Sequence, residues 1–209
     1  MITFTQQLVE KKIEEFCERQ FSKEAQKLED ANDILDYCIK KAWMDATQRE
    51  RFKGQKSEII QNKESITSNL KIEIENLEPS SNYDAWHEKM CSNPEHKMTY
   101  GIWQKLINMT FKYMYCRRKK FPNIDFSKCH CPIDSIIAQR AVTLGIVCEV
   151  EISDKTVSIA RSGKTNWNNM EPSDYMNVRK NIQEIKKEFK INNSDTRNPT
   201  ELEFDFLFW

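Results

Sequence analysis

The 209-residue chain has only four glycines and six prolines. Sandwiches and small barrels need many tight turns and therefore more of both residues, so their scarcity favours long helices. No stretch approaches the ~18 consecutive apolar residues of a membrane-spanning helix. We therefore expect a mainly helical globular protein without a membrane partner, and 39% hydrophobic residues are enough to build its core.

Signals for secretion and for common enzyme classes are also missing. The first residues lack a basic segment followed by an apolar one, and the seven cysteines are odd in number, which predicts free thiols in a reducing, cytoplasmic compartment. Serine-hydrolase, P-loop, dinucleotide-binding and zinc-protease motifs are absent. Cys116, Cys129, His130 and Cys131 are metal-ligand types without the spacing of paired zinc knuckles, so we expect no metal and no cofactor.

The overall charge is balanced, with 32 basic and 32 acidic residues, which excludes a globally basic coat. Residues 81–130 nevertheless carry nine basic and four acidic residues, a net charge of +5, whereas residues 1–80 and 131–209 have net charges of −3 and −2. A basic patch attracts phosphates whatever the total charge. We expect the main positive surface around residues 97–128.

Apolar periodicity predicts most of the secondary structure. Polar residues 51–68 predict a loop or frayed helix, and alternation on both sides of residues 154–155 predicts a small β-hairpin over 147–160. The apolar tail 202–209 is expected to dock on the body. Helices are predicted over residues 9–21 and 34–43 (packed together as a hairpin), 83–90, 100–116, 134–144 (with Gly145 as its C-cap) and 172–189.

A turn at Pro79–Asn82 predicts a boundary within one compact unit. We expect an N-terminal helical lobe over residues 1–80, hairpin and catalytic helices over 81–145, and a β-hairpin, a helix and a docked tail over 146–209.

Two short motifs carry the functional prediction. The first is Gly-Ile-Trp-Gln-Lys at 101–105, and the second is Pro-Ile-Asp at 132–134, with Lys105 and Asp134 separated by 29 residues. Together they resemble the Gly-apolar-Gly-x-Lys and Pro-apolar-Asp motifs of the helix-hairpin-helix DNA glycosylase superfamily, in particular its lyase-type bacterial and archaeal 8-oxoguanine glycosylases. The resemblance covers about residues 99–145, and Trp103 replaces the second glycine.

This resemblance implies a mainly α, two-lobed, helix-hairpin-helix glycosylase-like fold and a double-stranded DNA partner that contains a lesion or a modified base. It implies that Lys105 attacks the C1′ atom of an extruded nucleotide, that a Schiff base follows, and that β-elimination then breaks the strand. Asp134 would accept the lysine proton and stabilise positive charge on the sugar. The base removed (an oxidised purine by default), the lyase step and the oligomeric state are left open, and no protein partner is inferred.

DNA contacts and a base pocket are expected around these two residues. Backbone N–H groups at the start of a helix bind phosphate, and a basic run adds attraction to the DNA backbone. The expected DNA contacts are Gly101, Ile102, Gln104, Lys112, Arg117 and Arg118. The candidate aromatic residues for the base pocket are Trp86, Trp103, Phe126 and Trp167.

Each of these features also has an ordinary structural interpretation. Lys105 fits the polar stripe of a solvated helix, Asp134 fits a helix N-cap, and residues 117–120 fit a solvated helix end. Two non-catalytic functions therefore compete with the glycosylase. One is a helical protein-interaction protein, for example in a bacterial or phage conflict system, and the other is a helix-hairpin-helix DNA binder without catalysis, which the substitution at Trp103 keeps open.

Overall fold

The computed structural model describes residues 2–48, 50, 57–93, 98–161, 167–192 and 196–208. It confirms the mainly helical class, and a two-stranded parallel sheet accompanies the helices. No helix within these described segments is both long and apolar enough to cross a membrane. The helices are α1 (Gln6–Gln20), α2 (Lys23–Gln26), α3 (Ala31–Ala46), α5 (Glu58–Gln61), α6 (Lys63–Glu75), α7 (Tyr83–Cys91), α8 (Tyr100–Cys116), α9 (Ser135–Cys148), α10 (Asp154–Arg161), α11 (Pro172–Lys187) and α12 (Glu201–Phe208). The remaining elements are strands β1 (Ile2–Thr5) and β2 (Phe189–Asn192) and 3₁₀ helices η3 (Arg118–Lys120) and η4 (Trp167–Asn169).

Helix α8 is the central element, and its predicted bounds, 100–116, are confirmed. The Thr99 hydroxyl accepts a hydrogen bond from the Ile102 N–H and caps the first turn. Almost every side chain of the helix is buried, because α3, α7, α1 and η4 pack around it. Trp43 of α3 and Trp103 of α8 are among the largest fully buried side chains. Truncating either to alanine is expected to cost about 3–5 kcal/mol.

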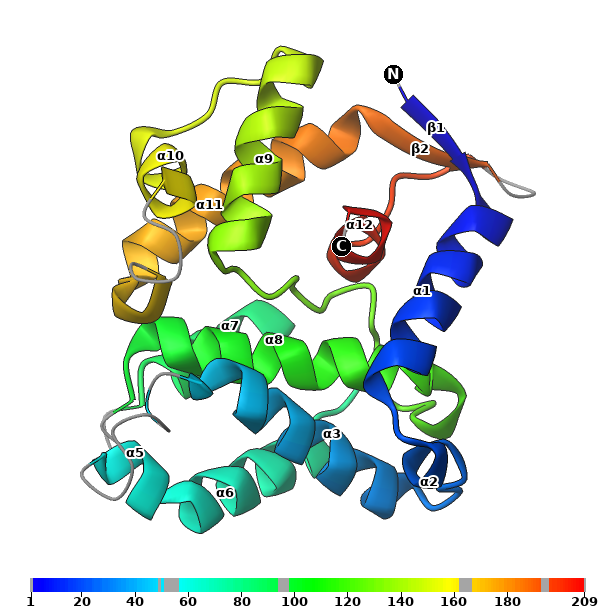
Figure 1. Ribbon diagram of the computed structural model, residues 1–209, viewed down its shortest axis with the longest axis vertical. Coiled ribbons are helices and arrows are strands. Elements are labelled where there is room, and N and C mark those ends of the chain that lie inside the picture. The colour runs from blue at the N-terminus through cyan, green and yellow to red at the C-terminus, as the bar shows by residue number, and fades with distance from the viewer. Residues whose placement is uncertain are drawn as a thin grey trace.

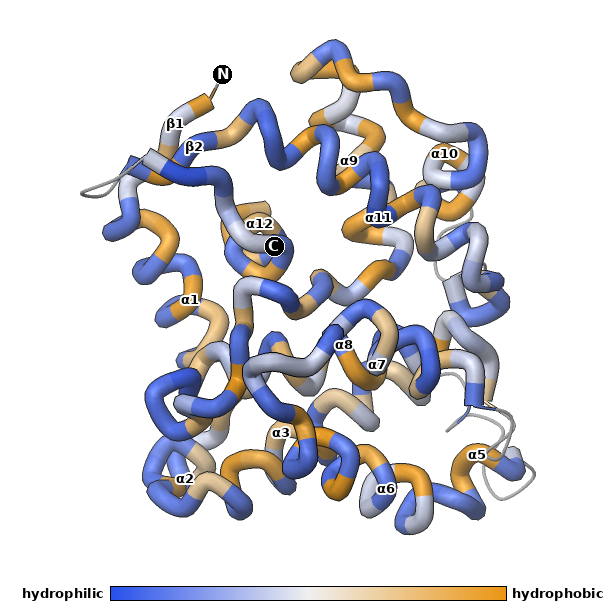
Figure 2. The backbone as a smooth tube through the Cα atoms, turned by 180° about the vertical axis from the view of Figure 1, so that it is seen from behind, coloured by the Kyte–Doolittle hydropathy of each residue, from blue (hydrophilic) through white to orange (hydrophobic). Residues whose placement is uncertain are grey.

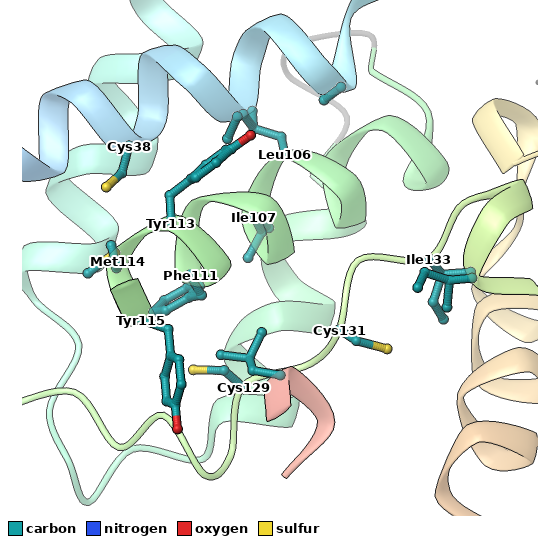
Figure 3. Packing of buried hydrophobic residues seen from close by; sticks show 14 of the residues in the cluster. Cys38, Leu106, Ile107, Phe111, Tyr113, Met114, Tyr115, Cys129, Cys131 and Ile133 are labelled. Atoms are coloured by element: carbon teal, nitrogen blue, oxygen red, sulfur yellow. The ribbon is translucent and has the colours of Figure 1, made fainter. Parts of the chain in front are cut away.

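Helices α3 and α6 lie on one side of α8, and α9, α10, α11 and α12 lie on the other (Figure 1). Apart from α8, the long helices bury one face each, so hydrophobic and hydrophilic residues alternate along the tubes of Figure 2. The two sides are joined by an extended segment, residues 129–133, which is buried along its length. Figure 3 shows Cys129 of this segment beside the α8 side chains Phe111 and Tyr115, and Ile133 farther along, near the start of α9.

The apolar C-terminal tail docks on the body as predicted and forms α12, between α1 and α11 (Figure 1). Phe206 packs edge-to-face on Phe16 with ring centroids 5.2 Å apart, and it stacks on Tyr115 at 5.7 Å. Burying these rings brings the one aspartate of the tail, Asp205, into the interior, where its side chain is 1% exposed. The position of Trp209 lies outside the described residues.

The predicted β-hairpin over 147–160 is wrong. Helix α9 continues to Cys148, and residues 154–161 form α10, whose Thr156 and Ile159 face the core. Gly145 is not the C-cap but lies inside α9, where the side chain of Ile152 packs against it, and Glu149 ends the helix with a left-handed φ of 56°. The described strands are instead β1 and β2, which pair in parallel with Ile2 opposite Phe189.

The expected packing of the first two long helices against each other is also wrong. Helix α1 packs on α12 and α8, whereas α3 packs on α8 and α6. A ring contact between Phe21 and Tyr37, 5.1 Å between centroids, joins the two helices near one end. Residues 63–68, the last part of the segment predicted as a loop or frayed helix, begin α6 (Lys63–Glu75), because Ile66, Leu70 and Ile74 share one buried face. Residues 51–56 of the predicted loop lie outside the described residues.

Candidate active site

Lys105 and Asp134 form an ion pair, with the lysine Nζ 2.9 Å from the aspartate Oδ2. Lys105 lies on the second turn of α8, and Asp134 is the N-cap of α9, so the buried segment between these helices brings the two side chains together. The other carboxylate oxygen, Oδ1, accepts hydrogen bonds from the backbone N–H groups of Ile136 and Ile137 at 2.9 and 3.1 Å. The lysine side chain is 12% exposed and the aspartate side chain 20%.

The carboxylate of Asp134 is held in its ionised form. Burial opposes ionisation, but the charge and hydrogen bond of Lys105 and the two backbone N–H groups outweigh it and lower the pKa of Asp134 below its usual value. The lysine ammonium also lies over the ring of Trp167, 4.3 Å from the centroid. Lys105 is therefore contacted by a carboxylate and by an aromatic face.

Both members of the pair line a cavity of about 290 Å³ between α1, α3, α8, the start of α9 and α12. Residues of α1, α3 and α12 reach it through packing between segments far apart in the sequence. Met44 and Ile136, which line the cavity, are 41% and 57% exposed. Further lining residues are Gln20, Asp45, Gln48, Met109, Tyr113 and Pro132.

A second ion pair lines the same cavity. The Nζ of Lys112 lies 2.7 Å from Oδ2 of Asp205, and both side chains are 1% exposed. Lys112 follows Lys105 by seven residues, which is about two helical turns and therefore the same face of α8. Apart from this ion pair, neither oxygen of Asp205 has a hydrogen-bond donor within the described part of the chain. Burial raises the pKa of Asp205 despite the adjacent lysine.

The sequence pointed to Lys105 and Lys112 but missed Gln20 and Asp205. The one available signal was Asp205 itself, because a carboxylate inside an otherwise apolar tail must find a partner when the tail is buried. Gln20 ends α1 and carries no comparable signal. In this structure Lys112 lies in the cavity wall rather than on an outer surface.

The start of α8 is packed against the protein itself. A Cβ atom on Gly101 would collide with the backbone carbonyl of Trp167, and the Thr99 hydroxyl donates to the carbonyl of Asn168. Ile102 is buried in the core. Gly101 therefore permits close approach of η4 to α8, and Ile102 contributes to the core.

Arg117 and Arg118 lie at the far end of α8 and have partners within the chain. The guanidinium of Arg117 donates to the backbone carbonyls of Ala25, Gln26 and Leu28. Arg118 lies 2.6 Å from the Glu10 carboxylate. Arg117 follows Lys105 by twelve residues, so it lies about 18 Å farther along the helix axis. The two arginines are not part of the cavity that holds Lys105.

The four candidate aromatic residues fall in different places. Trp167 contacts Lys105, whereas Trp103 is fully buried in the core. Trp86 is half-buried and donates a hydrogen bond to Glu73, and Phe126 packs edge-to-face on Tyr115. Trp167 is therefore the candidate that the structure brings to the Lys105–Asp134 pair.

Gln104 and the cysteine-rich segment are buried and make their contacts inside the protein. The Gln104 amide donates to the carbonyl of Ile133 at 2.7 Å and accepts from its N–H at 3.1 Å. His130 is hydrogen-bonded to Asp84 and Tyr175. Burial raises the pKa of the Cys129 and Cys131 thiols well above the usual value. Among the described residues, no three His, Cys, Asp or Glu side chains converge as metal ligands.

The arrangement combines a primary amine, an ionised carboxylate and an enclosed polar wall in one cavity. Such a set can transfer a proton and form a bond from nitrogen to an electrophilic carbon. Comparisons of the chain with protein-family models, with curated proteins and with solved structures find no match.

Proposed function

We propose that this protein is a DNA glycosylase in which Lys105 is the nucleophile and Asp134 is its proton acceptor. The observation that carries the proposal is the 2.9 Å contact between the Lys105 Nζ and the Asp134 Oδ2 at the wall of a 290 Å³ cavity. The helix-hairpin-helix glycosylase-like fold is part of the same proposal, supported by the positions of these residues at the starts of α8 and α9. We place the activity in the cytoplasm.

The chemistry follows from the two groups. The Lys105 ammonium passes a proton to Asp134, and the neutral amine forms a bond to C1′ while the bond from C1′ to the base breaks. The leaving base takes up the proton that Asp134 carries. The sugar ring then opens to a Schiff base on Nζ, and the ring oxygen takes up the proton that the nitrogen loses. The Asp134 carboxylate, which has given its proton to the base, accepts a C2′ proton, and the C3′–O bond breaks with the 3′ phosphate as the leaving group. Hydrolysis of the Schiff base by water releases the lysine.

The second ion pair suits the wall of a base pocket. A volume near 290 Å³ is at the lower end for ligand sites and matches a single extruded base better than a stretch of strand. The Asp205 carboxylate accepts hydrogen bonds and Lys112 donates them. A guanine-type base presents N–H donors to such a carboxylate. We therefore propose an oxidised purine, such as 8-oxoguanine, as the substrate.

The duplex would reach the cavity through its mouth. Met44 and Ile136 are exposed at the cavity and come from different helices, α3 and α9. Because a glycosylase takes its target base out of the stack, the DNA has to lie across this mouth. We therefore propose that the duplex binds on the face of α3 and α9, away from Arg117 and Arg118, which have partners elsewhere on the chain.

Two observations favour a non-catalytic protein as the second candidate. The Asp134 Oδ1 caps α9 in the ordinary way, and η4 covers the start of α8, where a helix-hairpin-helix protein would bind phosphate. In that case the Lys105–Asp134 contact would be a structural ion pair. The two candidates differ in covalent chemistry, because a structural pair forms no adduct with DNA.

Borohydride trapping tests the proposal, since it reduces a Schiff base to a stable bond between protein and DNA. We expect the wild-type protein to trap on duplexes that contain 8-oxoguanine or an abasic site. The abasic duplex tests the amine independently of which base the pocket selects. Lys105→Gln should abolish trapping on both. Lys71→Gln is the matched control, because Lys71 is also a helix lysine paired with an aspartate, at 2.8 Å from Asp36, but lies outside the cavity.

Two results would contradict the proposal. One is a wild-type protein that traps on neither duplex, and the other is a Lys105→Gln variant that traps as well as Lys71→Gln. Either result would favour the structural ion pair and the non-catalytic candidate.

A further inference from the structure

The segment that delivers Asp134 to the site has no sheet or helix of its own. Residues 129–133 form no regular element and are buried, and they run between α8 on one side and α9 and α12 on the other (Figure 1). Buried backbone N–H and C=O groups must be hydrogen-bonded, and in such a segment the partners have to come from elsewhere. The position of Asp134 therefore depends on what binds the backbone just before it.

Gln104 binds the peptide groups of Ile133, the residue before Asp134. Its Nε2 donates to the Ile133 carbonyl at 2.7 Å, and its Oε1 accepts from the Ile133 N–H at 3.1 Å. The side chain is fully buried, and its Nε2 also donates to the Gly101 carbonyl at 3.0 Å. The amide thus replaces the neighbouring strand that the segment lacks.

Asn108, one turn farther along α8, also binds the backbone of this buried segment. Its Nδ2 lies 3.1 Å from the Cys131 carbonyl and 3.3 Å from the Gln104 Oε1. Its Oδ1 accepts a hydrogen bond from the Nε2 of His87 at 3.0 Å. The Gln104 amide is therefore held on both sides and has little freedom to rotate.

We infer that Gln104 is a positioning residue for Asp134. Gln104 and Lys105 are consecutive residues of helix α8. The Lys105 amine and the Gln104 amide that binds the backbone of Ile133 are therefore held in a fixed position relative to each other. Loss of the hydrogen bonds between Gln104 and Ile133 would let the Asp134 Oδ2 move away from the Lys105 Nζ, and the Asp134 Oδ1 away from the N–H groups of α9. This inference rests on the proposed glycosylase function for its catalytic meaning, but its geometric content does not depend on that function.

The first arm of the test needs no DNA. Carboxyl carbon NMR follows the titration of Asp134 in the free protein. In Gln104→Met, which keeps the length but loses the hydrogen bonds of the amide, the Asp134 pKa should rise toward its ordinary value, because both contacts that lower it depend on position. Gln104→Asn, which keeps a shorter amide, should give a smaller rise. An unchanged Asp134 pKa in both variants would overturn the inference.

Asn181→Leu is the matched control for lost stability. Asn181 of α11 clamps another irregular segment, donating to the Glu151 carbonyl at 2.9 Å and accepting from the Ser153 N–H at 3.2 Å. Its loss should lower the melting temperature as the loss of Gln104 does, but it should leave the titration of Asp134 unchanged. A rise in the Asp134 pKa in Asn181→Leu as large as in Gln104→Met would show a general loosening and would overturn the inference.

The second arm uses the 8-oxoguanine duplex under single-turnover conditions. Gln104→Met should slow base release by about 10- to 100-fold while DNA affinity stays within about twofold, because a misplaced group raises the barrier to chemistry more than it weakens binding. In the Asp134→Asn background the same substitution should have almost no further effect, since the two residues act through one carboxylate. An additive slowing in the double variant would overturn the inference.

The two arms separate the failure of each proposal. A wild-type protein that releases no base from any lesion duplex contradicts the glycosylase, and the titration arm then decides the positioning role alone. A wild-type protein that is active, with Gln104→Met equally active, contradicts the positioning role and leaves the glycosylase standing.

Discussion

The carboxylate of Asp134 faces two partners at once: its Oδ2 lies 2.9 Å from the Nζ of Lys105, and its Oδ1 caps helix α9. The cap orients the carboxylate, and the lysine binds its other oxygen. The cap is a structural role and the contact with the lysine is the proposed catalytic one, and substitutions can separate the two.

Asp134→Asn is expected to separate these roles. Asparagine caps helices about as well as aspartate, so the loss in the free energy of unfolding should come mainly from the Lys105 ion pair and amount to about 1–3 kcal/mol. Base release from the 8-oxoguanine duplex should nevertheless slow by orders of magnitude, because the amide cannot accept the lysine proton or balance charge on the sugar. Urea unfolding measures the first effect and single-turnover kinetics the second. Base release at the wild-type rate in Asp134→Asn would show that Asp134 acts only as an N-cap.

The buried pair of Lys112 and Asp205 should be costly to break and dispensable for folding. Asp205→Asn removes the negative charge that faces the Lys112 ammonium in a fully buried site, and such a change costs about 3–5 kcal/mol. The double variant Lys112→Met with Asp205→Leu should regain most of that stability, because a well-packed apolar pair replaces buried charges with little loss. Thermal unfolding of the wild type, of Asp205→Asn and of the double variant measures both effects.

The same double variant should also change which base the protein selects. The double variant should still trap on an abasic duplex through Lys105, but it should lose its preference for 8-oxoguanine, since the polar wall of the cavity is gone. An unchanged preference for 8-oxoguanine would show that Lys112 and Asp205 do not contact the base.

The elements that could be predicted from the sequence are those whose pattern is local. Helix α8 was predicted to the residue from its broad apolar face, and in the structure Thr99 caps its first turn. The β-hairpin prediction failed because alternation over 147–152 also fits a helix end with exposed Ile146 and Val147 followed by a short connection. The pairing of β1 with β2 joins segments almost a chain length apart, and no local pattern encodes it.

The candidate site also combines residues in local sequence motifs with residues brought in by long-range packing. Lys105 and Asp134 lie in short motifs at helix starts, and the spacing of the motifs is compatible with two neighbouring helices. Gln20 and Asp205 reach the cavity only because α1 and α12 pack on each other and on the body. Their positions follow from long-range packing, which depends on many side chains at once and leaves no sequence motif.

Gly101→Ala is expected to destabilise the protein. A methyl group at this position would meet the backbone of Trp167 and Asn168, which cannot rotate away as a side chain can, so we expect a loss of about 1–3 kcal/mol. Gly145→Ala is the control and should cost less, because the two nearest atoms there belong to the Ile152 side chain rather than to the backbone, and alanine is the better helix residue. Urea unfolding compares them. A weakened DNA affinity with unchanged stability in Gly101→Ala would instead indicate a phosphate-binding glycine.

Two buried histidines should make the protein sensitive to mild acid. Burial lowers the pKa of His87 and of His130 below the usual value, and the hydrogen bonds of His130 to Asp84 and Tyr175 fit a neutral ring. The unfolded chain binds these protons near pH ~6.5, so the stability contributed by the neutral rings is present above that pH and is lost as the pH falls.

The size of this effect follows from proton linkage. Each histidine that stays neutral in the folded protein lowers the free energy of unfolding by about 1.4 kcal/mol per pH unit below pH ~6.5. Urea unfolding at pH 7.5, 6.5 and 5.5 measures the slope, and ordinary surface carboxylates contribute little there because they titrate at lower pH. His87→Gln keeps a donor for Asn108 and should remove the His87 share of the slope. A wild-type stability that is flat or rises from pH 7.5 to 5.5 would contradict the neutral state of both rings.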